Sequence, residues 1–209
     1  MSNLPIRYVS VDVECDGPDY GVHSCRMLGL AVSRPYPNLP GILNPARSGS
    51  WCEHKLRYCL EKTPGTRTDP QTMEQFWSVN QELAAYIQAH ARPASEVARQ
   101  VQGFLSSLTT ESRLVFVAKP TSYDLPWLRQ ILIDGAVETD LIPHSSVCIS
   151  SLLKGLDFLG INRKEVNATV RAEELPHTHF ADDDALGQLY MFLQLRRLYR
   201  EVGRSLGAR

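Results

Sequence analysis

The sequence predicts a single α/β domain in which a mixed β-sheet is flanked by α-helices. Apolar runs typical of buried strands come early, helical repeats lie between them, and a long helical repeat closes the chain. The 209 residues, 43% of them hydrophobic and 22% charged, suffice for one domain with a substantial core. No internal repeat or low-complexity segment divides the chain, so residues 1–209 are interpreted as one domain.

Strands are predicted where β-branched and other apolar residues cluster between turn-forming residues. The four predicted strands are Ile6–Glu14, Met27–Val32, Trp51–Leu60 and Arg113–Ala118. We expect the second strand to run antiparallel to the first, because the Gly-, Pro- and Asp-rich residues 15–21 form a turn between them. Residues 33–70 are rich in proline and are interpreted as an elaborated edge of the same domain.

Helices are predicted from capping residues and from apolar residues at helical spacing. Asp69 and Pro70 are suited to the N-cap and the first helical position, and this helix is expected to run to Ala85 or beyond. A second helix follows Pro93, where an apolar stripe recurs at helical spacing. The remaining predicted helices open at Tyr123, cover residues 150–159, and run from near Asp183 to near Arg204.

The overall composition is that of a soluble protein without a strong charge. The formal net charge is −1 and the pI is about 6.6, so an anionic partner must be bound by a local site and not by a general basic field. The odd number of cysteines, five, without a Cys-x-x-Cys pair favours reduced thiols and a cytoplasmic location. No apolar run is long enough to span a membrane, and the first residues lack a signal sequence, so no membrane association is expected. Cys52, Glu53, His54 and Cys59 suggest zinc ligands, but a fourth protein partner is missing, so no structural zinc is expected.

Two carboxylates interrupt the first strand. Asp12 and Glu14 are two residues apart, so their side chains are expected on the same face of the sheet. Two like charges on one face of a buried strand repel each other and resist desolvation unless a cation lies between them. An Asp-x-Glu pair also occurs by chance, so this pair alone is a modest indication of a metal site.

Two further segments place acids at the ends of predicted elements. Asp124 follows the fourth strand, and three consecutive aspartates, residues 182–184, open the last helix. His177 and His179 precede that helix. Each group has an ordinary interpretation by itself: an aspartate at a helix start is usually a cap, and a histidine there is usually a surface residue. The three segments together favour a metal site.

Taken together, these segments resemble the three motifs of the DEDD 3′–5′ exonucleases, which have a ribonuclease H-like fold. Asp12-Val13-Glu14 resembles the first motif, and Ala118-Lys119-Pro120-Thr121-Ser122-Tyr123-Asp124 resembles the second. His179-Phe180-Ala181-Asp182-Asp183-Asp184-Ala185 resembles the third. The resemblance spans most of the chain in the order of the family, and it implies a ribonuclease H-like mixed sheet.

The third motif has two registers, because His177 with Asp182 has the same spacing as His179 with Asp184. The second pair is preferred, because the aspartate of the family is followed by alanine at the helix start. Phe180 stands where another branch of the family has tyrosine, so the chain fits the histidine branch, DEDDh, and looks most like phage and bacterial exonucleases, some of which act on RNA. The chain departs from the common pattern at Pro120 and near Cys148, which bears on the substrate more than on the chemistry.

The resemblance implies a phosphodiester hydrolase with two divalent cations, Mg²⁺ or Mn²⁺. Asp12 would bridge the two ions, and Glu14, Asp124 and Asp184 would complete their ligand shells. His179 would act as the general base towards the attacking water. The implied product is a 5′-mononucleotide released from the 3′ end of single-stranded nucleic acid, with RNA slightly favoured over DNA.

Three residues near the motifs, Cys15, Trp77 and Tyr123, are candidate substrate contacts. For Trp77 and Tyr123 the reason is that aromatic rings stack on bases. Trp51 is a further aromatic candidate, whereas Trp127 is assigned to the core. The arginines near the C-terminus, residues 196, 197, 200 and 204, are interpreted as a solvated helix face more than as a phosphate track.

Two alternatives remain open at the level of the sequence. One is a DNA-specific 3′–5′ exonuclease, and the other is a non-catalytic nucleic-acid-binding adaptor on the same fold. The full set of four acids and a histidine argues against an adaptor, because a binding module does not need it. Many members of the family are dimers, which leaves a homodimer open for this chain.

Overall fold

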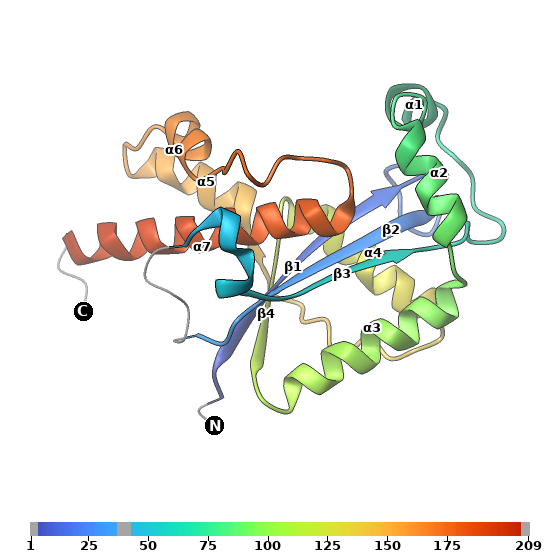
Figure 1. Cartoon of the computed structure of the whole chain (residues 1–209), viewed down its shortest axis with the longest axis horizontal. Coiled ribbons are helices and arrows are strands. Elements are labelled where there is room, and N and C mark those ends of the chain that lie inside the picture. The colour runs from blue at the N-terminus through green and yellow to red at the C-terminus, as the bar shows by residue number, and fades with distance from the viewer. Residues whose placement is uncertain (1–3, 37–42, 206–209) are drawn as a thin grey trace.

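A five-stranded sheet in the order β3-β2-β1-β4-β5 forms the centre of the computed structural model, which describes residues 4–36 and 43–205 (Figure 1). The strands are β1 (Ile6–Cys15), β2 (Cys25–Ser33), β3 (Cys52–Cys59), β4 (Arg113–Ala118) and β5 (Val147–Cys148). The pairs β1–β2 and β2–β3 are antiparallel, whereas β4 runs parallel to β1 and to β5. The mixed sheet and the antiparallel pairing of the first two strands are therefore confirmed.

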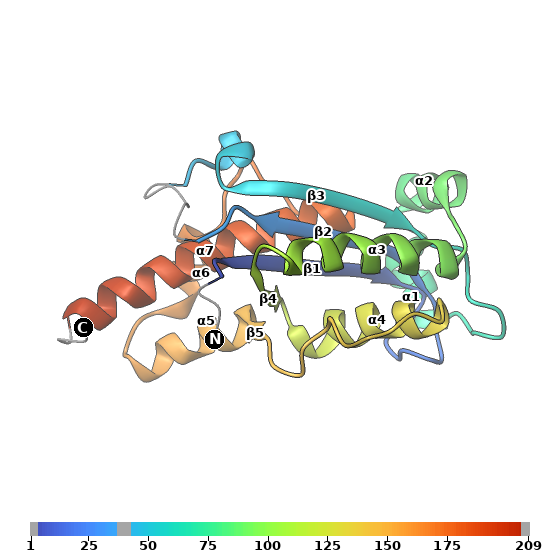
Figure 2. The same cartoon turned by 90° about the horizontal axis from the view of Figure 1, so that it is seen from below.

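Helices cover both faces of this sheet. Helices α3 (Ala94–Thr109) and α4 (Thr121–Asp134) pack on one face, and α5 (Ile149–Phe158) and α7 (Ala181–Ser205) pack on the other (Figures 1 and 2). The smaller helices are η1 (Pro45–Ser50), α1 (Pro70–Thr72), the π-helix η2 (Met73–Trp77), α2 (Gln81–His90) and α6 (Arg163–Thr169). No helix of the described residues is long and apolar enough to cross a membrane.

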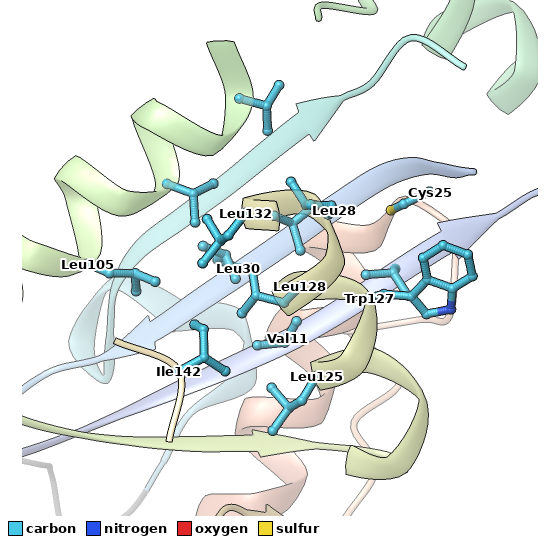
Figure 3. Packing of buried hydrophobic residues seen from close by; sticks show 14 of the residues in the cluster. Val11, Cys25, Leu28, Leu30, Leu105, Leu125, Trp127, Leu128, Leu132 and Ile142 are labelled. Atoms are coloured by element: carbon cyan, nitrogen blue, oxygen red, sulfur yellow. The ribbon is translucent and has the colours of Figure 1, made fainter. Parts of the chain in front are cut away.

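The alternation of β1 separates its core side chains from its polar ones. Val9, Val11 and Val13 point into the core under α3 and α4, where Figure 3 shows Val11 beside leucines of α4. Tyr8 belongs to the other core, beneath α7. Because successive side chains alternate across a strand, Asp12 also faces α7. The strand therefore presents its carboxylates to the helix that carries the third acidic segment.

A close approach between β2 and α7 fixes where that helix begins. A Cβ atom added at Gly29 would lie 2.0 Å from the carbonyl carbon and oxygen of Ala181, the first residue of α7. Gly29 is also the cross-strand partner of Asp12. The absence of a side chain at Gly29 lets the start of α7 rest on the sheet directly beside Asp12.

The largest departure from the predicted elements concerns the helix expected from Asp69 to Ala85. Asp69 caps α1 as predicted, since its carboxylate accepts the Thr72 N–H at 2.8 Å. The helix then widens, with the Ser78 N–H donating to the Met73 carbonyl, and breaks before α2 starts at Gln81. Asn80 contributes to the break, because its side-chain amide donates to the Phe76 carbonyl. The prediction of one continuous helix from Asp69 to Ala85 is therefore wrong.

Other boundaries differ less. β4 has the predicted ends, and the predicted edge region carries β3 at the sheet edge, while residues 37–42 lie outside the described part of the chain. α7 begins at Ala181, two residues before the predicted start. The two-residue β5 and the short α6 were not predicted, because neither is long enough to show a period.

Candidate active site

Three carboxylates meet where β1 faces the start of α7. Ligand oxygens of Asp12, Glu14 and Asp184 all lie within 4.8 Å of one another. The first two arrive together because they are two apart on one strand, and Asp184 is brought to them by the approach of α7 to Gly29. Segments about 170 residues apart in the sequence thus share one acidic site.

Backbone groups hold Asp184 in this position. Its two carboxylate oxygens accept the Thr178 N–H at 2.9 Å and the His179 N–H at 3.0 Å. His179 has a φ of +62°, the left-handed region that turns the chain into α7. The local turn before the helix therefore orients the carboxylate.

The neighbouring aspartates of α7 point elsewhere. Asp182 pairs with Arg57 and Lys55 of β3, and Asp183 pairs with the same two cations. Both acids are neutralised by the sheet edge and are absent from the acidic groups that could hold a metal ion in the described residues. The aspartate at this site is thus Asp184, which lies five residues after His179.

Asp124 lies in the first turn of α4, at the end of β4, with 3% of its surface exposed. Its Oδ2 atom is buried without a hydrogen-bond partner. Burial raises the pKa of Asp124 to about 7, although backbone N–H groups partly offset this. A buried carboxylate oxygen with no partner in the protein is the feature expected of a metal ligand.

The cluster is electrostatically strained. Burial is the main reason that the pKa of Asp12 lies well above its ordinary range, and the charges of Asp124, Glu14 and Asp184 add to it. The pKa of Glu14 is raised to about 9 by burial and by Asp184 and Asp124. Four carboxylates provide the hard oxygen ligands that Mg²⁺ and Mn²⁺ prefer, and divalent cations would remove the repulsion among them. The residues present therefore fit a divalent-cation site.

Two histidines border the carboxylates from the turn before α7. The His179 side chain is 39% exposed, and its Nδ1 lies 3.9 Å from Glu14 Oε1. The edge of Phe76 also contacts it, with ring centroids 5.1 Å apart. Burial and the neighbouring His177 lower the pKa of His179, so its ring is neutral at pH 7 and able to accept a proton. His177 is 64% exposed and lies 3.3 Å from Asp184 Oδ2.

Two hollows adjoin the cluster, each lined by different carboxylates. A cavity of about 410 Å³ is lined by Glu14, Phe76 and Tyr123, with no lysine or arginine in its wall. A larger cavity of about 640 Å³ is lined by Asp12 and Asp184 together with basic and apolar residues. Both volumes are in the range of small-ligand sites, about 300–1,000 Å³.

The predicted substrate contacts are placed unequally. Tyr123 lines the smaller cavity and donates its hydroxyl to the Gly17 carbonyl at 3.4 Å. Trp77 is only 7% exposed and packs in the core with Met27, so its faces cannot stack on a base. Cys15 borders the smaller cavity, but the residue is buried in the main core, so its side chain offers little contact. The base-stacking role predicted for Trp77 is therefore corrected: its ring is buried and packs in the core.

Other candidates from the sequence are also buried or paired. Trp51 is fully buried beneath α7, which excludes base stacking, and Trp127 is in the core as predicted. Neither of the two metal-capable groups in the described residues contains a cysteine, and all five cysteines are free. Arg196 lies over the Tyr36 ring at 4.2 Å, a contact within the protein.

Two residues at the site were missed by sequence reasoning. Gln188 donates from Nε2 to Asp12 Oδ1 at 2.6 Å, which fixes one oxygen of that carboxylate. It lies four residues after Asp184, so helical spacing could have revealed it on the same face of α7. Phe76 falls inside the helix predicted from Asp69, and only the π-helix turn places its ring against His179.

No family model matches this sequence, and no curated protein matches it. Solved structures of nucleases do share its fold. The nuclease domain of 3′hExo, a DEDDh family member bound to rAMP, gives a TM-score of 0.55 at 12% identity and covers 96% of this chain and 95% of that one. Cell-death related nuclease 4 gives 0.63 at 14% identity, with 92% of this chain and 64% of that chain covered.

A product-bound structure of exonuclease I gives a TM-score of 0.59 at 10% identity, and this chain, 94% covered, spans 44% of its length. At these identities the likeness establishes the fold. The ribonuclease H-like fold predicted from the three motifs is confirmed, and it is the fold of DEDDh nucleases.

Proposed function

We propose that this chain is a DEDDh-type 3′–5′ exonuclease that hydrolyses single-stranded nucleic acid and releases 5′-mononucleotides. The observation that carries this proposal is the meeting of Asp12, Glu14 and Asp184 within 4.8 Å on a nuclease fold. Asp124 is proposed as the fourth carboxylate, because its charge raises the pKa of Asp12 and of Glu14 and its Oδ2 is buried without a partner.

Asp12, Glu14, Asp124 and Asp184 would hold two divalent cations, Mg²⁺ or Mn²⁺. Bound there, the cations would stabilise the charge that develops on the attacking and leaving oxygens of the phosphodiester. Asp12 would be shared between the two cations, a role that its proximity to the other carboxylates supports, since the charges of Asp124, Glu14 and Asp184 all raise its pKa. Gln188 holds one of its oxygens and so fixes its orientation.

His179 would be the general base. Its lowered pKa keeps the ring neutral, and the positive φ of its backbone projects it from the turn beside Glu14. It would accept the proton of the attacking water, a contribution of roughly 10²–10⁴ in rate. His177 is more exposed and contacts Asp184, so it is assigned an orienting role.

The charges of the two cavities support cleavage at a chain end. The smaller cavity has aromatic walls and no cationic residue, so it suits a terminal nucleoside that carries no phosphate beyond the scissile one. The larger cavity contains Lys119 and Arg171 and suits the side on which the phosphate backbone continues. A 3′-terminal nucleoside in the smaller cavity would leave as a 5′-mononucleotide.

RNA is favoured slightly over DNA. Asp69, Gln71 and Gln75 add polar side chains to the wall of the smaller cavity. Such groups can bond a 2′-hydroxyl, the feature by which a protein distinguishes ribose from deoxyribose.

The test is a time course on matched 5′-labelled RNA and DNA oligonucleotides with Mg²⁺ or Mn²⁺. A ladder that shortens from the 3′ end, is abolished by EDTA and is absent in Asp12→Ala supports the proposal, and the faster oligonucleotide gives the sugar preference. Binding without cleavage under either metal would favour a non-catalytic adaptor instead.

A further inference from the structure

The larger cavity, of about 640 Å³, holds two cationic side chains close to the carboxylate cluster. Lys119 is the residue directly after β4, and Arg171 follows α6 in the segment that leads to α7. They come together only through the fold, 52 residues apart in the sequence. Asp12 and Asp184 form part of the same wall, so the cations border the cleavage site.

Neither cation is held by a side-chain partner in the described part of the chain. Across residues 4–36 and 43–205, no ion pair or side-chain hydrogen bond involves Lys119 or Arg171. Burial lowers the pKa of Lys119, and the charge of Arg171 lowers it further, whereas no carboxylate raises it. Glu173 also lines the cavity but is exposed. Lys119 is partly buried and Arg171 is exposed, and with no ion-pair partner among the described residues both are available to bind an anionic group of a ligand.

The rest of the cavity suits a nucleotide. Ala172, Leu175, Pro176 and Met191 contribute apolar surface to its wall. An apolar wall with a few convergent charges is the usual composition of a small-ligand site. A nucleoside can pack on that wall while its 5′-phosphate reaches the two cations.

We propose that Lys119 and Arg171 bind the phosphate on the 5′ side of the penultimate nucleotide, one phosphate upstream of the scissile one. This inference rests on the proposed exonuclease function and adds the contact that recognises the continuing chain. It follows that the enzyme distinguishes a 5′-phosphorylated dinucleotide, pNpN, from the same dinucleotide without that phosphate, NpN. Both have one cleavable bond, and only pNpN has a phosphate for the pair.

The experiment compares kcat/KM for pNpN and NpN in the full-length protein with Mn²⁺. Wild type is expected to prefer pNpN by about tenfold or more, the size of a charge-assisted contact. Lys119→Gln and Arg171→Gln should each lower the rate on pNpN and leave NpN within about twofold, so that the preference shrinks towards one. Lys119→Arg should restore it. Arg99→Gln, an exposed arginine on α3 across the sheet, is the matched control and should keep the full preference.

The same two dinucleotides are also measured by equilibrium binding in EDTA, which needs no hydrolysis. Wild type should bind pNpN more tightly than NpN, and Lys119→Gln should remove the difference. Equal affinity and equal rate for the two dinucleotides in wild type, or variants that weaken both equally, would overturn the inference while leaving the nuclease intact. Absent cleavage with a retained pNpN preference in binding would instead refute the nuclease and keep the phosphate site.

Discussion

Replacing a buried carboxylate of the proposed active site should stabilise the metal-free protein, the opposite of the usual effect of a core substitution. Asp124→Asn is the sharpest case, because the side chain keeps its shape and can still accept the backbone hydrogen bonds. The substitution removes an ionisable group whose Oδ2 is buried without a partner. The gain should appear only above the pH at which the unfolded aspartate ionises.

The magnitude follows from the pKa of Asp124, which burial raises from 3.8 to about 7. The folded protein therefore holds a proton that the unfolded chain releases, so the free energy of unfolding falls as pH rises from about 4 to about 7. At ~1.4 kcal/mol per pKa unit the loss is at most about 4 kcal/mol. Asp124→Asn does not suffer this loss, and we expect it to be more stable than wild type by about 2–4 kcal/mol at pH 8.

The assay is thermal unfolding in EDTA at pH 4 and pH 8. For a chain of this length the gain corresponds to a Tm increase of roughly 5–10 °C at pH 8, with little difference at pH 4. Saturating Mn²⁺ should raise the Tm of wild type more than that of Asp124→Asn, since a ligand stabilises the state that binds it. An Asp124→Asn protein that melts at or below the wild-type temperature in EDTA at pH 8 would refute the strained-carboxylate account.

Four further outcomes are expected. His179→Ala should lower kcat by roughly 10²–10⁴ while Mn²⁺ binding, measured by calorimetry, persists, because the base is not a ligand; unchanged kcat would exclude His179 as the base. Gly29→Ala should destabilise the fold by about 2 kcal/mol or more and reduce activity, because the new Cβ collides with the start of α7. The control is Gly103→Ala on α3, where an added Cβ has no other atom within 4 Å, and this variant should be neutral or stabilising in the same thermal unfolding experiments. Phe76→Ala should raise KM more than it lowers kcat in steady-state assays, and an unchanged KM would remove it from the substrate cavity. Apparent Mn²⁺ affinity should increase from pH 6 to pH 9, because the cation must displace a proton from Glu14, whose pKa is about 9; a flat titration series would contradict this.

The sequence was most informative where one element explains the placement of a residue. Alternation along β1 was sufficient to put Asp12 and Glu14 on one face, and the structure places them there. The apolar stripe after Pro93 likewise predicted α3 and its buried face. These inferences depend on local periods, which the backbone geometry imposes regardless of the rest of the fold.

Tertiary pairing explains what the sequence left open. Asp182 and Asp184 each lie five residues after a histidine, and the structure separates their roles because Arg57 and Lys55 of β3 pair with the first. Trp77 and Phe76 are neighbours in one π-helical turn, and which of them is buried depends on α2 and Met27. Contacts between residues more than 100 positions apart carry no local signal.

The central claim is that the four-carboxylate cluster binds divalent cations, and a Mn²⁺ titration followed by electron paramagnetic resonance tests it most directly. In the presence of a 5′-mononucleotide, wild type should bind about two ions per chain, and Asp12→Ala should lose at least tenfold in affinity. Asp157→Ala, an exposed acid on α5 that pairs with Arg163, should titrate like wild type. Equal Mn²⁺ binding by wild type and Asp12→Ala would contradict the metal site and the nuclease that depends on it.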